Sequence, residues 1–326
     1  MSRPVWTRII FKSSALILLA SGIAWAQGGW RSERLTNSGG DLNAVFFESS
    51  RRGWVAGDNG FMSRTVDGGR TWTRKVLTTD QAVNDIYFRN EDDGFVLAGS
   101  RILGTGDGGQ TWREVERLQP SEFGGATAYL YSVRFPTSKK GWIVGSISRR
   151  DTVVGSLILS TTDGGASWQR RRVPTRDELI HVDFVNDKRG WIVGAGGTIL
   201  RTEDGGDTWA EQRSGVRGTL YHVDFRDSDH GWAVGDRGTI LRTVNGGSTW
   251  MTVATPVRAK LLSVQFTNDH EGWVVGWGGL ILHSTDGGET WTRQDSGTRE
   301  NLYALFVEKK RGWAVGGDGV ILSYER

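Results

Sequence analysis

The chain consists of short runs of apolar and β-branched residues separated by clusters of glycine, asparagine, aspartate and serine. The stretch 220–253 shows this pattern clearly. The segments "LYHVDF", "GWAVG", "TILRT" and "TWMTV" have the composition of strands, and "RDSDH", "DRG" and "VNGGS" join them. Aromatic and β-branched runs between turn-forming residues predict strands connected by tight turns. We therefore expect four consecutive short strands in this stretch.

The four-strand pattern repeats along the chain. An octet such as "STDGGETW" (284–291) occurs six times, and its third position holds Asp67, Asp107, Asp163, Asp204, Asn245 and Asp286. A second series marks seven units with glycine followed by an aromatic residue: Trp54, Phe95, Trp142, Trp191, Trp232, Trp273 and Trp313. The last four octets are each 41 residues apart. Several short strands in a period of this length predict propeller blades, so residues 27–326 are expected to form one all-β, seven-bladed β-propeller with four-stranded blades.

The last unit ends after "GVILSYER", where its fourth strand is missing. The segment "GGWRSERLTNSGGDLNAVF" near the N-terminus matches "GGETWTRQDSGTRENLYALF", with Trp30 in the place of Trp291. We therefore expect the N-terminal strand of the mature chain to complete the last blade. Closing the ring in this way would remove the open sheet edges.

Each predicted first strand ends near a phenylalanine that lies seven residues before the second position of the Gly-Trp or Gly-Phe pair. These residues are Phe47, Phe88, Phe135, Phe184, Phe225, Phe266 and Phe306. Because the side chains of a strand alternate between its two faces, a constant spacing predicts that each ring packs at an equivalent place between neighbouring blades.

The first 26 residues differ from the rest. A basic start (Arg3, Arg8 and Lys12), the apolar segment "SALILLASGIA" and the small-residue site "AWA" predict a signal peptide that is cut before Gln27, with an uncleaved N-terminal anchor as the alternative. The chain has 40 basic and 37 acidic residues, and removing three basic ones leaves 37 of each. Bulk attraction to nucleic acid is therefore not supported. The absence of cysteine excludes disulfides, thiol nucleophiles and thiolate metal sites.

The octets resemble the Asp-box, or BNR repeat, in which the acid bonds main-chain amides of its own turn and the tryptophan packs beneath. With the Gly-Trp series, the segments "RGWIVGAGGTILRTEDGGDTWAEQ" and "HGWAVGDRGTILRTVNGGSTWMTV" resemble the photosystem II stability/assembly factor family and its bacterial relatives. The resemblance implies a non-enzymatic, exported chaperone that uses an arginine-rich surface, in the thylakoid lumen of photosynthetic members. We expect a location in the periplasm or thylakoid lumen, or secretion, and a monomer without a cofactor.

The order of strands in a blade places the second-to-third and fourth-to-first connections on one face and the Asp-boxes on the other. We call the first of these the arginine face. It is expected to bind a protein partner, a membrane protein subunit or its exported segment, through Arg149, Arg150, Arg171, Arg172, Arg176, Arg213, Arg217 and Arg237. Arginine has a planar fork of donors suited to carboxylates and polar backbone. The insertion "SISRRDTVVGS" is expected to extend a hairpin in the third unit.

Two alternatives remain at this stage. One is an exported glycan-binding or glycoside-hydrolysing propeller of the Asp-box type. Hydrolysis would need two carboxylates, and Asp151, Asp236 and Asp318 are the candidates. "HVDF" occurs twice and places His181, Asp183, His222 and Asp224 on neighbouring innermost strands. These four could hold a metal near the axis. Alternatively, they could form hydrogen bonds between blades or to water in the channel, which is the interpretation we favour.

Overall fold

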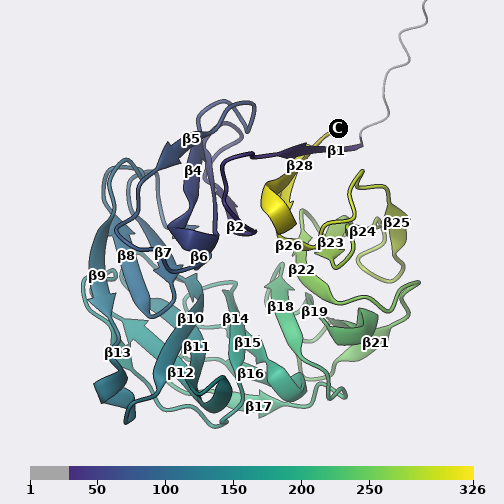
Figure 1. Ribbon diagram of the computed structural model, residues 1–326. Coiled ribbons are helices and arrows are strands. Elements are labelled where there is room, and N and C mark those ends of the chain that lie inside the picture. The colour runs from purple at the N-terminus through teal and green to yellow at the C-terminus, as the bar shows by residue number, and fades with distance from the viewer. Residues whose placement is uncertain (1–28) are drawn as a thin grey trace, which may run out of the picture.

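The computed structural model describes residues 29–326, so the predicted signal peptide, 1–26, lies outside the described residues. Seven four-stranded antiparallel sheets form a ring, with the first strand of each sheet nearest the centre (Figure 1). This confirms the predicted seven-bladed propeller. Within residues 29–326, no helix has the length and apolar character needed to cross a membrane.

The blades follow one another along the chain. Blades 1 to 3 contain β2 (Leu42–Phe47), β3 (Gly53–Gly57), β4 (Met62–Thr65) and β5 (Thr73–Lys75); β6 (Val83–Phe88), β7 (Gly94–Ala98), β8 (Arg101–Thr105) and β9 (Arg113–Arg117); and β10 (Thr127–Arg134), β11 (Gly141–Arg149), β12 (Thr152–Thr161) and β13 (Gln169–Arg170). Blades 4 and 5 contain β14 (Leu179–Phe184), β15 (Gly190–Gly194), β16 (Ile199–Thr202) and β17 (Ala210–Gln212); and β18 (Leu220–Phe225), β19 (Gly231–Gly235), β20 (Ile240–Thr243) and β21 (Met251–Val253). The long β11–β12 pair confirms the predicted extended hairpin.

Blade 6 contains β22 (Leu261–Phe266), β23 (Gly272–Gly276), β24 (Leu280–Ser284) and β25 (Thr292–Gln294). Blade 7 contains β26 (Leu302–Val307), β27 (Arg311–Gly316), β28 (Val320–Glu325) and, from the other end of the chain, β1 (Trp30–Arg34). Short 3-10 turns are η1 (Asp58–Gly60), η2 (Pro120–Phe123), η3 (Ala195–Gly197), η4 (Asp236–Gly238) and η5 (Gly317–Gly319).

The N-terminal strand closes the ring as predicted. β1 pairs antiparallel with β28 from Trp30 opposite Tyr324 to Arg34 opposite Val320 (Figure 1). The Trp30 ring lies 5.5 Å from the ring of Trp273 and 5.4 Å from that of Tyr324, measured between centroids. Main-chain pairing and aromatic packing therefore both hold the two ends of the described chain together.

Aromatic stacks join one blade to the next. Phe225 stacks on Trp191 with centroids 3.4 Å apart, and Phe266 stacks on Trp232 at 3.5 Å. In each of these pairs, the phenylalanine at the end of a first strand packs on the Gly-Trp residue of the preceding blade. The same neighbours meet at four other junctions, with separations up to 6.4 Å: Phe88 with Trp54, Phe135 with Phe95, Phe184 with Trp142, and Phe47 with Trp313.

The prediction that Phe306 fills the seventh equivalent place is wrong. In blade 7, Val307 pairs with Gly312, as Phe266 pairs with Gly272 in blade 6. The turn between β26 and β27 is one residue shorter than its counterparts, so counting back from the Gly-Trp pair reaches Phe306 instead of Val307. Trp273, the partner that a phenylalanine at 307 would have, stacks on His283 of its own blade at 3.8 Å.

Candidate protein-binding face

The main-chain hydrogen bonds show which turns share a face. Gly238 of η4, a second-to-third turn, donates its N–H to the carbonyl of Ala259 in a fourth-to-first connection, with N and O 2.8 Å apart. On the opposite face, Gly287 of an Asp-box donates to the carbonyl of His270 in a first-to-second turn at 2.9 Å. The arginine face and the Asp-box face are thus on opposite sides of the ring, as the strand order predicts.

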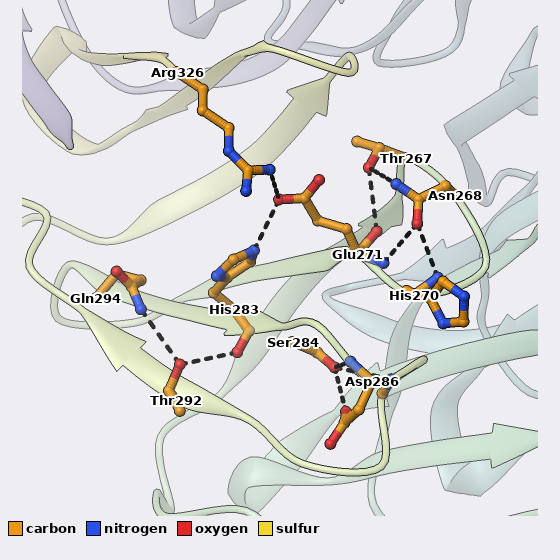
Figure 2. A network of polar contacts seen from close by, with 11 residues as sticks. Thr267, Asn268, His270, Glu271, His283, Ser284, Asp286, Thr292, Gln294 and Arg326 are labelled. Carbon is orange, nitrogen blue, oxygen red and sulfur yellow. Dashed lines mark hydrogen bonds and ion pairs between the residues drawn. The ribbon is translucent and has the colours of Figure 1, made fainter. Parts of the chain in front are cut away.

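The Asp-box turns are held by their own side chains. In blade 6, the Ser284 hydroxyl donates to the Asp286 carboxylate at 2.8 Å (Figure 2), and that carboxylate also accepts the amide and hydroxyl of Thr290. Asp67, Asp107, Asp163 and Asp204 make the same set of bonds. Asn245 replaces the acid and still accepts the Thr249 amide at 2.9 Å. These residues are therefore occupied in closing turns.

The carboxylates of these turns are held in their charged form. The hydroxyl and amide of Thr71 both donate to Asp67, and these bonds lower the pKa of its carboxyl to about 2. The two glycines after the acid have the left-handed backbone that the turn requires, with φ of 76° at Gly68 and 88° at Gly69.

All eight predicted partner-binding arginines are exposed, and they lie in turns, in connections or, for Arg149, at the end of a strand. Arg149 and Arg150 are at the tip of the extended hairpin, and Arg171, Arg172 and Arg176 follow β13. Arg213 and Arg217 lie between β17 and β18, and Arg237 is in η4. The structure therefore places them over blades 3 to 5, in two groups separated along the ring.

In the part of the chain that the structure describes, the eight arginines have no carboxylate partners, whereas two arginines next to Asp-boxes do. Arg242 pairs with Glu289 at 3.5 Å, and Arg201 pairs with Glu203 at 2.6 Å, so the charges of both are balanced locally. Within residues 29–326, none of the eight arginines forms an ion pair. Arg149 donates to the Gly124 carbonyl at 2.9 Å, and Arg171 donates to the Ser160 hydroxyl at 2.7 Å. Their charges remain available to an acidic ligand.

The backbone at Arg237 is unusual for an arginine. Its φ is 58°, in the left-handed region that glycine, asparagine and aspartate occupy most readily. The equivalent positions in other blades hold Asn59, Gly196, Gly278 and Asp318. Keeping a long side chain there costs roughly 1 kcal/mol, and strained residues of this kind occur preferentially at functional sites.

An exposed tryptophan was missed by the sequence reasoning. Trp277 follows β23 on the arginine face and is 45% exposed, and the Lys260 ammonium lies 4.6 Å from the centre of its ring. Exposed tryptophans next to cationic side chains are typical of the residues that dominate protein interfaces. The signal was present, because Trp277 stands where other blades have small or polar turn residues.

The centre of the ring contains a polar cavity of about 270 Å³, lined in part by Asp85, Arg134, His181 and His222. Arg134 donates to the Asp85 carboxylate at 3.0 Å and lies 3.0 Å from Nε2 of His181. The two histidine rings stack with centroids 3.6 Å apart. Burial and the Arg134 charge lower the pKa of His222 to about 3, so this imidazole is neutral.

The carboxylates near the axis connect blades. Asp183 accepts the Phe225 amide and Asp224 accepts the Phe266 amide, both at 2.8 Å. Hydrogen bonding between blades is thus confirmed for Asp183 and Asp224, whereas Nδ1 of His222 is buried without a partner in the described chain. Burial, followed by repulsion from Asp183, raises the pKa of Asp224 to about 8. Within the part of the chain that the structure describes, no three histidines or carboxylates lie close enough together to hold a metal ion.

The candidate glycosidase acids are held in turns. Asp236 accepts the Thr219 amide at 3.1 Å and the Tyr221 hydroxyl at 3.0 Å. Asp318 forms an ion pair with Arg34, and Asp151 is an exposed residue at the tip of the extended hairpin. These contacts give Asp236 and Asp318 structural roles on the arginine face.

Several solved structures share this fold. A structure of YCF48 bound to a D1 peptide is 22% identical, with a TM-score of 0.74 and coverage of 92% of this chain and 96% of that chain. YCF48 from Cyanidioschyzon merolae is 21% identical, with a TM-score of 0.70 and coverage of 91% and 98%. Inactive virginiamycin B lyase from Staphylococcus aureus with quinupristin is 12% identical, with a TM-score of 0.76 and coverage of 92% and 100%. At these identities the likeness shows the fold alone.

A search of curated protein sequences gave no match. A family model described as Photosynthesis system II assembly factor YCF48 matches residues 74–173, 166–218 and 212–299, which together cover most of the chain. The matched residues run from the outer strand of blade 1 to the connection after blade 6 and include all eight arginines. The chain therefore belongs to the photosynthesis system II assembly factor YCF48 family.

Proposed function

We propose that this protein is a non-enzymatic assembly factor that binds a segment of a protein partner through its arginine face. The observation that carries the proposal is the group of eight exposed arginines without ion pairs in the described chain. Family membership supports the same function, and so does the related YCF48 structure with a bound D1 peptide. The partner is a membrane protein subunit or its exported segment, of the photosystem II type where the organism is photosynthetic.

The proposal includes export. The basic, apolar and small-residue segments of 1–26 support a cleaved signal peptide, and the balanced charge of the remaining chain argues against bulk binding to nucleic acid. The protein would then work as a monomer in the periplasm or thylakoid lumen, or after secretion. Expression of the full chain, followed by N-terminal sequencing of the periplasmic protein, tests this part; a mature protein that retains residues 1–26 would contradict cleavage.

Binding can be tested with a D1 peptide and calorimetric titration. Reversing Arg213, Arg217 and Arg237 to Glu should weaken binding at least tenfold, because even one lost charge-assisted hydrogen bond contributes about 1.5 to 3 kcal/mol. The matched control reverses three exposed cations of the Asp-box face, Arg51, Arg70 and Lys188. Equal affinities of the two triple variants would show that Arg213, Arg217 and Arg237 do not bind the peptide.

The non-enzymatic part of the proposal has its own test. Purified protein should not turn over sialyl or aryl glycosides above the uncatalysed rate. Turnover that disappears when Asp236 or Asp318 is changed to Asn would refute the assembly-factor function and favour an Asp-box glycosidase. Circular dichroism of each variant would show that lost turnover is not lost folding.

A further inference from the structure

Blade 3 has a sheet edge that its own outer strand does not cover. β12 extends from Thr152 to Thr161, whereas β13 pairs only with Leu159 and Ser160. One further bond joins the Arg171 amide to the Ile158 carbonyl at 2.9 Å. In blade 6, by comparison, β25 pairs with Ile281, Leu282 and His283, three of the five residues of β24. Residues 152–157 of β12 therefore have no outer strand within residues 29–326.

The uncovered edge presents main-chain groups. The Ile158 carbonyl points away from β11, because it accepts a bond from Arg171 on the outer side. Main-chain groups alternate along a strand, so the N–H and C=O of Ser156 point to the same outer side. Neither group has a main-chain partner there in the described chain. The connection after β13 lies next to Ser156, whose hydroxyl donates to the carbonyls of Thr175 and Asp177. Free edges of this kind are templates for an additional strand.

A groove of about 850 Å³ follows this edge. Ile147 and Val154 supply apolar surface, and Val154 is 48% exposed. Four arginines line the groove: Arg170, Arg171, Arg172 and Arg176. The acid in this lining is Glu122, which already accepts the Gln119 amide at 2.6 Å. The groove therefore combines a free strand edge, an apolar strip and an excess of positive charge.

We propose that an extended acidic segment of a protein partner binds in this groove and adds as a fifth strand to the edge of β12 in blade 3. Addition of a strand uses main-chain hydrogen bonds for affinity and alternate side chains for specificity. Apolar side chains of the segment would contact Ile147 and Val154, and its carboxylates would contact the arginines. The inference rests on the proposed function, because Arg171, Arg172 and Arg176 belong to both.

The first test uses a capped, fluorescent peptide of six alternating valine and glutamate residues, with binding measured by anisotropy. Two N-methylated forms are compared, each with three alternate amides blocked. Strand addition requires that one form binds at least tenfold more weakly while the other keeps its affinity, because only one set of amides faces β12. Equal affinities of the two methylated forms, or no binding of the unmodified peptide, would overturn the proposal.

Hydrogen exchange gives an independent readout on the same peptide. The Ser156 amide should exchange at least tenfold more slowly when the unmodified peptide is bound. Changing Arg171, Arg172 and Arg176 to Gln should lower the affinity for the peptide at least tenfold and leave the melting temperature of the protein unchanged. Unchanged exchange at Ser156 in the saturated complex would show that the peptide is held by side chains alone.

A full-chain variant separates this inference from the proposed function. Val154 is the extra residue of a β-bulge, since Ile147 pairs with Gly155 and Ser148 with Val153. Val154→Pro should therefore fold and should block strand addition. If this variant binds the six-residue peptide normally, the inference fails. It also fails if sedimentation shows that the wild-type protein is a dimer and the variant a monomer, because the edge would then bind a second copy of this chain. The D1-peptide titration of the Arg213, Arg217 and Arg237 variant would still test the proposed function at a separate group of arginines.

Discussion

The stacks between blades allow a quantitative prediction about two phenylalanines that have the same spacing in the sequence. Phe266 is 3% exposed, stacks on Trp232 and meets the edge of Trp291 at 5.8 Å. Phe266→Ala should therefore lower the free energy of unfolding by about 4 kcal/mol, the usual cost of removing a buried phenylalanine. Phe306 is only partly buried and meets Phe46 at 5.6 Å. Phe306→Ala should cost about 1 to 2 kcal/mol, because less apolar area is lost.

The assay is urea unfolding followed by tryptophan fluorescence and circular dichroism. Coincident transitions and equal slopes against urea would allow the free energies of the two variants to be compared. Phe225→Ala serves as a matched control, since Phe225 has the same neighbours in blade 5 and should behave like Phe266. If Phe306→Ala costs as much as Phe266→Ala, the assignment of Val307 to the stacking position is wrong.

Three further predictions concern the Asp-box turns, the buried carboxylate Asp224 near the ring axis, and the closure of the ring by β1. Asp286→Asn should keep nearly full stability, because Asn245 accepts the same amide bond in its own turn. Asp286→Ala should lower the free energy of unfolding by about 1 kcal/mol in chemical denaturation. Equal losses for the two variants would contradict the turn-closing role. Because the pKa of Asp224 is raised to about 8, the unfolded chain releases this proton near pH 4 and the folded chain near pH 8, so stability should fall as pH rises between them. Asp224→Asn should reduce that fall in urea titrations at pH 5 and 8; an unchanged slope would refute it. Trp30→Ala should cost about 3 to 5 kcal/mol and speed amide exchange in β28, and unchanged exchange would argue against closure by β1.

The repeat made the blades and the two faces predictable. The six octets and the Gly-Trp series set the number of blades, and the match between the segments around Trp30 and Trp291 identified the closing strand. Each of these signals is local and periodic, so spacing alone is enough to detect it. The extended hairpin of blade 3 was predictable for the same reason, because the insertion has residues typical of strands on both sides of "RRD".

The contacts between blades were less predictable. A turn that is one residue shorter in blade 7 moved Val307 into the stacking position, and counting from Trp313 could not detect the change. The same shift puts Ala304 in line with His181. Asp85 has the corresponding position in blade 2, but its contact with Arg134 depends on how two blades meet. Sequence spacing therefore predicts the strands within a blade, whereas the contacts between blades depend on how the side chains of two blades pack.

The pairing of β1 with β28 also determines when the protein can become complete during synthesis. Trp30 is made before all seven Gly-Trp and Gly-Phe pairs and Tyr324 after them, so β1 and β28 cannot meet until β28 has left the ribosome. The other six blades consist of consecutive strands and can form earlier from local contacts. The last blade therefore closes only when β28 pairs with β1, a strand that was synthesised before it. Any factor that holds back the N-terminal segment would delay completion of the ring without preventing the other blades from folding.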